Sequence, residues 1–292
     1  MNERKVFAGV VIDFRSLVRA FRAAGHRTRF VPARSRFTAP VEGIVFLAVP
    51  DYAVSEMAAR IAREKPAAAL SFVHVSGALG LGVLDALRGH AVGSFHPLQS
   101  FPEPRDPSAF RGITVAIDAS TPALRRRLAK LARDLGAKPR RVDDSGRALY
   151  HAAAVFASNY VVASIDEAVQ VLEAAGWRRA EAAKALIPLV EGVIANVRRR
   201  GTVRALTGPI RRGDAETVGR HIDALNRIGP SGAARHLPTS GQELPSIETV
   251  YRMLGLVALE IAKEAGLDPA AAGRTKRALT RDVAATRRRG RR

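Results

Sequence analysis

The sequence of 292 residues contains no cysteine, which excludes disulfide bonds, thiolate metal sites and cysteine nucleophiles. Long apolar runs are also missing, because none approaches the roughly 20 residues that span a bilayer. The first residues, Met1–Lys5, lack the apolar core of a signal peptide. Hydrophobic residues nevertheless make up 47% of the chain, as in folded domains. We therefore expect a cytoplasmic, globular protein with no membrane segment and no metal site.

Acidic and aromatic residues are scarce as well. Asp and Glu number 27 against 47 Lys and Arg, which gives a net charge of +20. Such a charge attracts nucleic acid or phosphorylated ligands. The arginines, however, are scattered along predicted helices, and few aromatic residues lie among them to stack on bases. We therefore do not expect a nucleic-acid partner, and we predict that the basic segment 276–292 is a flexible, solvated tail.

The beginning of the chain lacks the glycine-rich turn that holds a dinucleotide. An apolar run from Val6 leads directly into an amphipathic helix, and the junction reads Ile12-Asp13-Phe14-Arg15, with Gly9 as the nearest glycine. Glycines in a G-x-G-x-x-G turn let the backbone approach the diphosphate at the helix N-terminus. Side chains at the same place obstruct that approach, although Asp13 is also a suitable helix N-cap. Two outcomes stay open: altered, weakened dinucleotide binding, or its loss.

The pattern up to about residue 145 alternates apolar strands with helices. The predicted strands lie in the segments 5–12, 26–36, 43–51, 67–77, 91–101, 112–120 and 138–143. Continuous apolar strands separated by helices indicate a parallel sheet that is covered on both faces, a doubly wound α/β domain. From about residue 146 to 275 the period is helical throughout, so we predict a second, all-helical domain.

Several strings along the chain resemble a known family. They are VFLAVPD (45–51), VHVSGALG (73–80), FHPLQSF (95–101), YHAAAVFASNY (150–160) and LTGPIRRGDAETV (206–218). With this layout, the sequence is similar to the Rossmann-like oxidoreductases that carry the C-terminal domain of unknown function 2520. These proteins are distantly similar to pyrroline-carboxylate reductase, ketopantoate reductase and the deazaflavin-dependent NADP reductases. The resemblance implies an N-terminal Rossmann-like domain over residues 1–145, a cofactor of the nicotinamide class, and a homodimer.

The predicted cofactor contacts gather at the ends of strands. Arg34, Ser35 and Arg36 stand where NAD enzymes carry an acidic residue for the ribose, and guanidinium groups suit the 2′-phosphate of NADP. In a chain this rich in arginine, the alternative is that these arginines have no such role. The remaining expected cofactor residues are Gly9, Val49, Pro50, Ser76 and Gly77, and Ser76 is also a plausible helix cap. NADP(H) is thus the expected cofactor, with binding that is weakened or lost.

The candidate catalytic residues are His96, His151, Ser158 and Asn159. His96 follows the fifth strand, where it either donates a proton to a reduced carbonyl or imine or orders its loop. His151 and Ser158 lie seven residues apart on a predicted long helix, with Asn159 beside them. In related reductases, this helix supplies polar groups to the nicotinamide. A lone histidine on such a helix is otherwise a buried structural residue.

Substrate binding is expected from Gln99, Thr207 and Arg212, while Asp214 is predicted to cap a helix. The apolar helix faces of residues 146–275 favour dimerisation through that domain, which we also expect to hold the substrate site. Two functional hypotheses follow. The protein is either an NADP(H)-dependent oxidoreductase of a small carbonyl or imine, or a non-catalytic Rossmann relic that binds a metabolite or a protein partner.

Overall fold

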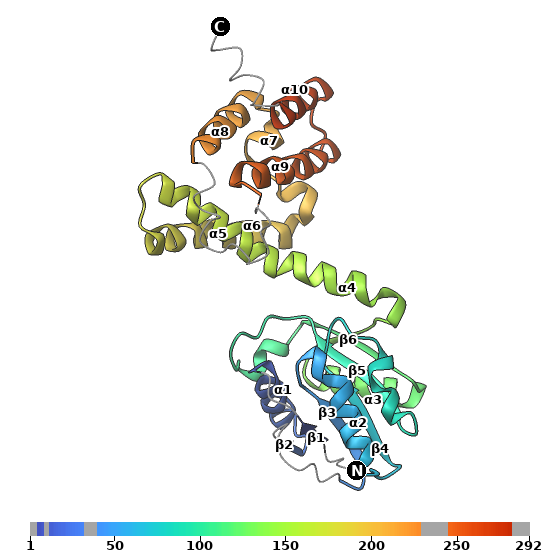
Figure 1. Cartoon of the computed structure of the whole chain (residues 1–292). Helices are drawn as coiled ribbons and strands as arrows, with labels where there is room; N and C mark the ends of the chain where they lie inside the picture. Colours follow the sequence, from blue (N-terminus) through green and yellow to red (C-terminus); the bar gives the residue numbers. More distant parts are fainter. Residues whose placement is uncertain (1–4, 9–11, 32–39, 229–244, 282–292) are drawn as a thin grey trace. The chain divides into compact units, whose positions relative to one another are not determined.

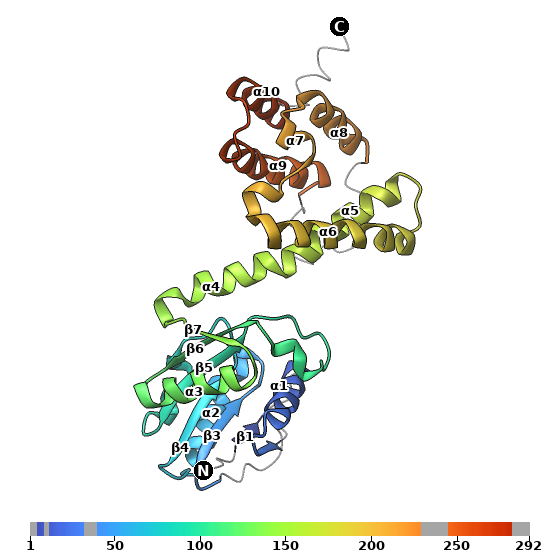
Figure 2. The same ribbon diagram turned by 180° about the vertical axis from the view of Figure 1, so that it is seen from behind.

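The computed structural model describes residues 5–8, 12–31, 40–228 and 245–281 (Figures 1 and 2). The chain divides into two compact units, Met1–Tyr160 and Val161–Arg292, and each unit is described by itself. The first unit extends past the expected boundary near residue 145 because the helix that follows the last strand packs on the sheet.

The first unit is built on one sheet of seven strands in the order β2-β1-β3-β4-β5-β6-β7. The strands are β1 (Lys5–Ala8), β2 (Thr28–Val31), β3 (Gly43–Leu47), β4 (Leu70–His74), β5 (Ala91–Pro97), β6 (Thr114–Ala119) and β7 (Lys138–Arg141). β1 to β5 are parallel to one another. This confirms the predicted Rossmann-like α/β class.

The central strand β3 shows why the strands are continuously apolar. Alternate side chains of a strand point to opposite faces of the sheet. Ile44 and Phe46 therefore enter one core with α1 and α3, while Val45 and Leu47 enter the other core with α2. All four are buried because helices cover both faces of the sheet (Figures 1 and 2).

One strand pair differs from the predicted parallel sheet. β5 and β6 are antiparallel, with Phe95 opposite Ile117 and His96 opposite Ala116. The connection between them contains no crossover helix, only the short 3-10 turn η3 (Pro107–Phe110). A parallel pair requires a crossover connection, so the chain returns here in the opposite direction.

The helical elements of the first unit follow the predicted pattern. They are α1 (Ile12–Ala23), η1 (Asp51–Ala53), α2 (Val54–Arg63), η2 (Leu81–Leu87), η3, α3 (Pro122–Asp134) and α4 (Asp144–Ala157). Helix α3 begins with Thr121 as its N-cap and Pro122 in its first turn, and Gly136 follows its end at a φ of 74°.

The second unit is helical in its described part. Its helices are α5 (Asn159–Ala174), α6 (Arg179–Ala205), α7 (Gly208–Arg212), α8 (Ala215–Ile228), α9 (Ile247–Glu264) and α10 (Pro269–Thr280). Helix α6 is interrupted at Gly201, which has a φ of 72° and a ψ of 171°. Helix α10 continues to Thr280, so the first residues of the predicted flexible tail are helical, and Leu279 is buried. Residues 282–292 lie outside the described part.

The segment Asp144–Ala174 differs from the single long helix that the sequence predicts. We predicted one uninterrupted helix there, but Ser158 has non-helical angles and separates α4 from α5. The segment is also long and apolar enough to cross a membrane by length and composition, although we expected no such segment. A single helix of this kind is weak evidence for a membrane span.

Candidate active site at the carboxyl edge of the sheet

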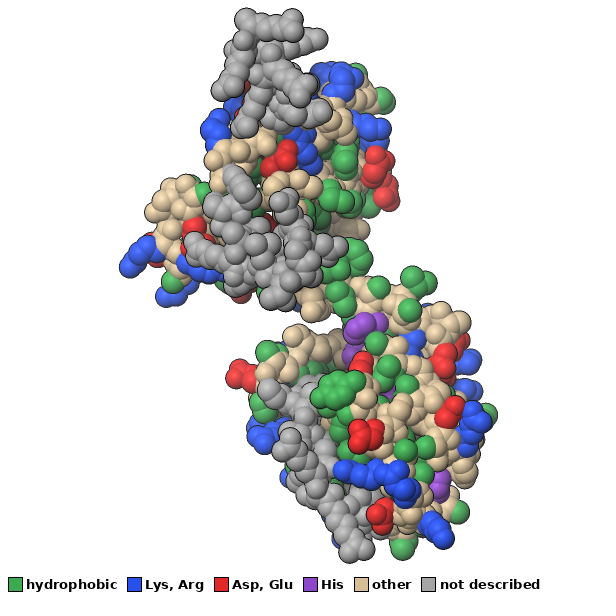
Figure 3. Space-filling view, in the orientation of Figure 1, with side chains coloured by type: hydrophobic (Ala, Val, Ile, Leu, Met, Phe, Trp, Pro, Cys, Tyr) green, Lys and Arg blue, Asp and Glu red, His purple; other side chains and the backbone are tan. Residues whose placement is uncertain are grey.

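Four segments of the first unit converge where the parallel strands end. The ends of β3, β4 and β5 contribute Asp51, Ser76, Gly77 and His96, and α4 crosses this edge. In doubly wound sheets, ligands bind beyond the carboxyl ends of the strands. On the face shown in Figure 3, histidine side chains gather at this end of the first unit.

The central interaction of the site joins His96 to Tyr150. Nδ1 of His96 lies 2.7 Å from the Tyr150 hydroxyl, and the two rings meet edge to face. Either atom is the donor, depending on the tautomer of the imidazole. His96 and His151 were predicted from the sequence. Tyr150, which lies between Arg147 and His151 on α4, was not.

Gly77 is a glycine because two histidines lie against it. A Cβ atom at this position would be 2.8 Å from Nε2 of His96 and 3.1 Å from Nδ1 of His151. Such contacts do not occur between unstrained groups, so a side chain at residue 77 would displace the ring of His96. The structure thus brings together three predicted residues, His96, His151 and Gly77.

A second glycine docks the beginning of α4 on the sheet. A Cβ at Gly80 would be 2.7 Å from the Asp144 carboxyl group, whose Oδ1 accepts the backbone N–H of Leu81 at 3.2 Å. Gly82 has no neighbour within 4 Å of such a Cβ. Residues 77 and 80 are glycines because side chains from other segments lie too close to leave room for a Cβ atom, and not because the chain turns tightly there.

Ser76 has a structural role, as its capping alternative predicted. Its Oγ accepts the backbone N–H groups of Ala78 and Leu79, each at 3.1 Å, and donates to Oδ2 of Asp51 at 2.9 Å. These bonds tie the turn after β4 to the end of β3. The Asp51 side chain is otherwise exposed to solvent.

Beneath the histidines lies the guanidinium of Arg147, which is 1% exposed. Its Nη2 donates to Oγ of Ser94 at 2.7 Å and to the backbone carbonyl of Val142 at 2.9 Å. Its Nε and Nη1 find no hydrogen-bond partner among the described residues. A buried cation of this kind acts strongly on its neighbours, because little water screens it.

Burial and this cation keep His96 and His74, the last residue of β4, neutral. Burial lowers the pKa of His96 to about 4, with His151 and Arg147 adding to the shift. Burial likewise lowers the pKa of His74 to about 3, assisted by Arg147. The sequence left two roles open for His96, proton transfer at a pKa near neutrality or ordering of its loop. The lowered pKa, caused by burial and by the nearby positive charge, assigns either role to a neutral imidazole.

The phenol of Tyr150 also keeps its proton at neutral pH. Burial raises the pKa of Tyr150 to about 12, although Arg147 opposes this in part. The pair therefore consists of a neutral phenol and a neutral imidazole over a wide range of pH. Such a pair can pass a proton along its hydrogen bond without either group being charged in the resting state.

Other predicted residues lie apart from this cluster. The Ser158 hydroxyl lies within hydrogen-bond distance of the carbonyl of Ala154 and of Oδ1 of Asn159, at the junction of α4 and α5. Gln99 is exposed and accepts the N–H of Ser100.

The remaining predictions fall into three groups. Val49 is buried and Pro50 is exposed at the end of β3. Thr207 and Arg212 belong to the second unit, at the two ends of α7, and Asp214 caps α8 as predicted through the N–H of Thr217. Gly9 and the segment 34–36, which contains Arg34, Ser35 and Arg36, lie outside the described residues.

Comparison with known proteins supports the resemblance seen in the sequence. Residues 113–257 match the family described as Domain of unknown function (DUF2520). This match spans β6 to α9 and therefore includes Arg147, Tyr150 and His151. No curated protein matches the chain in sequence.

Several solved structures share the fold of this chain. A Bacteroides fragilis protein provisionally described as an NADP oxidoreductase superposes with a TM-score of 0.69 at 20% identity, covering 89% of this chain and 98% of its own. A Thermotoga maritima protein gives a TM-score of 0.66 at 20% identity with the same coverage. Pyrroline carboxylate reductase of Plasmodium falciparum, with NADP bound, gives 0.53 at 11% identity, covering 95% and 100%. At these identities the likeness establishes the fold.

The packing at Gly77 predicts a specific cost for a single methyl group. We expect Gly77→Ala to lower the free energy of unfolding by about 1–3 kcal/mol, because the Cβ forces the ring of His96 to move. Gly82→Ala, in the adjoining 3-10 helix η2, is the control, and we expect a change within about 0.5 kcal/mol or a slight stabilisation, because nothing lies within 4 Å of the added Cβ. Urea unfolding of the three proteins measures both values. Equal stabilities for the two variants would contradict the close approach at Gly77.

Proposed function

We propose that this protein, which carries the DUF2520 domain, is an NADP(H)-dependent reductase of a small carbonyl or imine compound. The observation that carries the proposal is the pair of His96 and Tyr150, 2.7 Å apart at the carboxyl edge of the sheet. This is the edge where such sheets bind ligands. The fold shared with NADP oxidoreductases supports the same reaction class.

The proton in this scheme comes from the phenol of Tyr150. Bound NADPH would supply a hydride to the carbon of the C=O or C=N bond. The oxygen or nitrogen that gains the electron pair then takes the proton of the Tyr150 hydroxyl. The phenol recovers a proton from Nδ1–H of His96, while Nε2 of His96 takes one from solvent. The imidazole changes its tautomer in this exchange and carries no net charge before or after it.

The described residues fit part of a dinucleotide. At the end of β3, the exposed carboxylate of Asp51 can accept hydrogen bonds from the hydroxyl groups of a ribose. Its negative charge would repel a diphosphate. We propose Arg34, Ser35 and Arg36 as the holders of the 2′-phosphate of NADP, and Ile12–Arg15 as the reason for a weak diphosphate contact. The rival hypothesis, a relic without catalysis, rests on this same departure from the glycine turn.

The first prediction for this function concerns the cofactor. We expect NADPH to bind more tightly than NADH, and Arg34→Ala with Arg36→Ala to weaken NADPH binding by about tenfold or more while leaving NADH unaffected. Arg63→Ala, an exposed arginine of α2, is the control for a general loss of positive charge. Calorimetric titration at two salt concentrations measures these affinities. Absence of binding by either nucleotide would favour the relic.

The second prediction separates the proton donor from cofactor binding. With a small ketone, which does not itself titrate, we expect Tyr150→Phe to lower kcat by about 10²–10⁴-fold and to leave the Kd of NADPH unchanged. The kcat of the parent should be flat across neutral pH, because the pKa values of the pair are about 4 and about 12. A bell-shaped profile centred near pH 7, or full activity of the phenylalanine variant, would assign the proton to another group.

We further propose that the chain forms a homodimer through its second unit. Large apolar side chains of α6 and α9 are exposed, among them Leu189, Val193, Met253 and Val257. Figure 3 shows hydrophobic side chains on the surface of this unit, with basic side chains spread around them. Monomeric proteins rarely leave such an apolar area open to water.

This proposal predicts the mass of the protein in solution. We expect light scattering to give twice the mass of the chain, and Val193→Glu to shift the protein towards the monomer, because it places a charge in the apolar face. Lys184→Glu changes charge at an exposed polar position of the same helix and should preserve the dimer. A parent that stays monomeric over a wide range of concentration would refute the proposal.

A further inference from the structure

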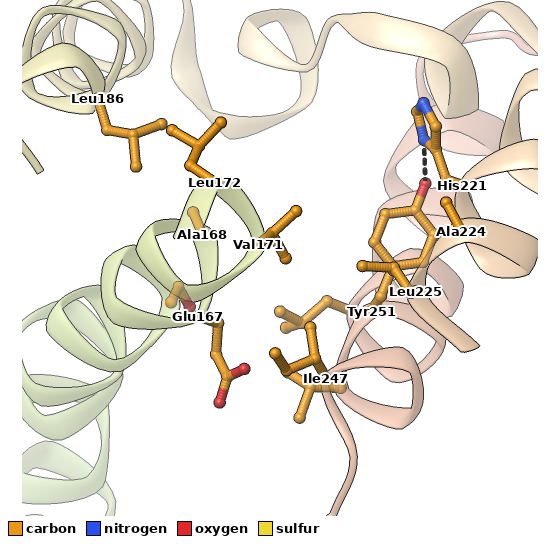
Figure 4. Close-up of a pocket in the computed structure, with 13 residues that line it drawn as sticks. Glu167, Ala168, Val171, Leu172, Leu186, His221, Ala224, Leu225, Ile247 and Tyr251 are labelled. Atoms are coloured by element: carbon orange, nitrogen blue, oxygen red, sulfur yellow. Dashed lines mark hydrogen bonds between the residues drawn. The ribbon is translucent and has the colours of Figure 1, made fainter. Parts of the chain in front are cut away.

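The second unit contains a cavity that the proposed reduction does not use. It has a volume of about 470 Å³ and lies between α5, α6, α8 and α9 (Figure 4). Its walls are mainly aliphatic, with Val171 and Leu172 from α5, Leu186 from α6 and Leu225 from α8. Cavities of this size accept small organic ligands. An occupant must therefore present a hydrocarbon surface to most of this lining.

One wall of the cavity carries a carboxyl group whose hydrogen bonding is incomplete. Figure 4 shows Glu167 extending from α5 towards Ile247. Its Oε2 is buried, and no described residue donates a hydrogen bond to it. The neighbouring Asp166, in contrast, accepts bonds from Arg179 and Gln170. Burial raises the pKa of Glu167, and the charge of Asp166 adds to this shift.

The other wall carries a hydrogen-bonded pair of aromatic rings. Nδ1 of His221, on α8, lies 2.9 Å from the hydroxyl of Tyr251, on α9. In Figure 4 this pair stands on the side of the cavity opposite Glu167. Because the Tyr251 hydroxyl is engaged with His221, the ring offers its apolar surface to an occupant. The face of a tyrosine ring also attracts cations.

We propose that this cavity binds a hydrophobic organic amine, with its ammonium group beside Glu167 and its hydrocarbon chain against the aliphatic lining. An ammonium group would donate the hydrogen bond that Oε2 of Glu167 lacks among the described residues. It would also carry the charge opposite to that of the carboxylate. The net charge of +20 disfavours cations in general. The attraction is therefore local, and small polar cations that gain no apolar burial should not bind.

The test compares three probes that share one alkyl chain. Calorimetry of the full-length protein with decylamine, decanol and decanoate, all below their micelle concentrations and without nucleotide, isolates the contribution of the head group. We expect decylamine to bind at least about tenfold more tightly than decanol, and decanoate more weakly than either. Glu167→Gln should abolish the preference for the amine while retaining the binding of decanol. Glu191→Gln, on the exposed surface of α6, is the control and should keep that preference.

A cavity-filling variant locates the site. Ala168→Phe places a ring in the cavity and should remove the binding of both decylamine and decanol, while circular dichroism reports that the helices are intact. Equal affinities for the amine and the alcohol, or a Glu167→Gln variant that still prefers the amine, would overturn the proposal. So would the absence of probe binding, or a change of the light-scattering mass with Ala168→Phe alone, since the latter indicates that a second copy of the chain occupies the cavity. No arm of the test uses NADPH, so its outcome is independent of the reductase proposal.

Discussion

The buried guanidinium of Arg147 sets the properties of the whole edge of the sheet. Withdrawing such a charge from water costs several kcal/mol unless its donors are satisfied. Here Ser94 and Val142 accept hydrogen bonds from one nitrogen, and Asp144 lies 3.9 Å from another. Burial is the main cause of the lowered pKa values of His74 and His96 and of the raised pKa of Tyr150. The charge of Arg147 adds to the first two shifts and opposes the third. The positive charge at this edge thus belongs to Arg147, while the neighbouring His74 and His96 are neutral at physiological pH.

The period of the sequence predicted the core well, but the expected parallel direction is wrong for β6 and β7, which run antiparallel to β1–β5. Alternating burial along β3, the cap at Thr121 and the glycine after α3 each depend on local residues, so a single sequence reveals them. The antiparallel pairing of β5 with β6 depends on the path of the connection between them. Apolar periodicity is the same for a strand that runs in either direction, and it could not distinguish the two.

The active-site prediction was half complete for a related reason. His96 and Gly77 were recognised because they follow strands, where chemistry is expected. Arg147 and Tyr150 lie in the first half of α4. They were not recognised because arginines are common throughout this chain, so one more arginine on a helix gives no signal in the sequence. Their spacing was nevertheless informative: Asp144, Arg147 and Tyr150 succeed one another at intervals of three, and His151 lies four residues after Arg147, so all four share one face of α4.

The anchoring of α4 by its first residue makes this helix a lever. Asp144 holds it to the backbone of Leu81, and Tyr150 lies about 9 Å further along, at 1.5 Å per residue. A tilt of about 5° around this fulcrum moves the phenol by less than about 1 Å, and moves Arg147, halfway along, by half as much. The guanidinium therefore moves less than the phenol for any such tilt. Substitutions further along α4 can adjust where the phenol meets a substrate with a smaller displacement of the charge beneath it.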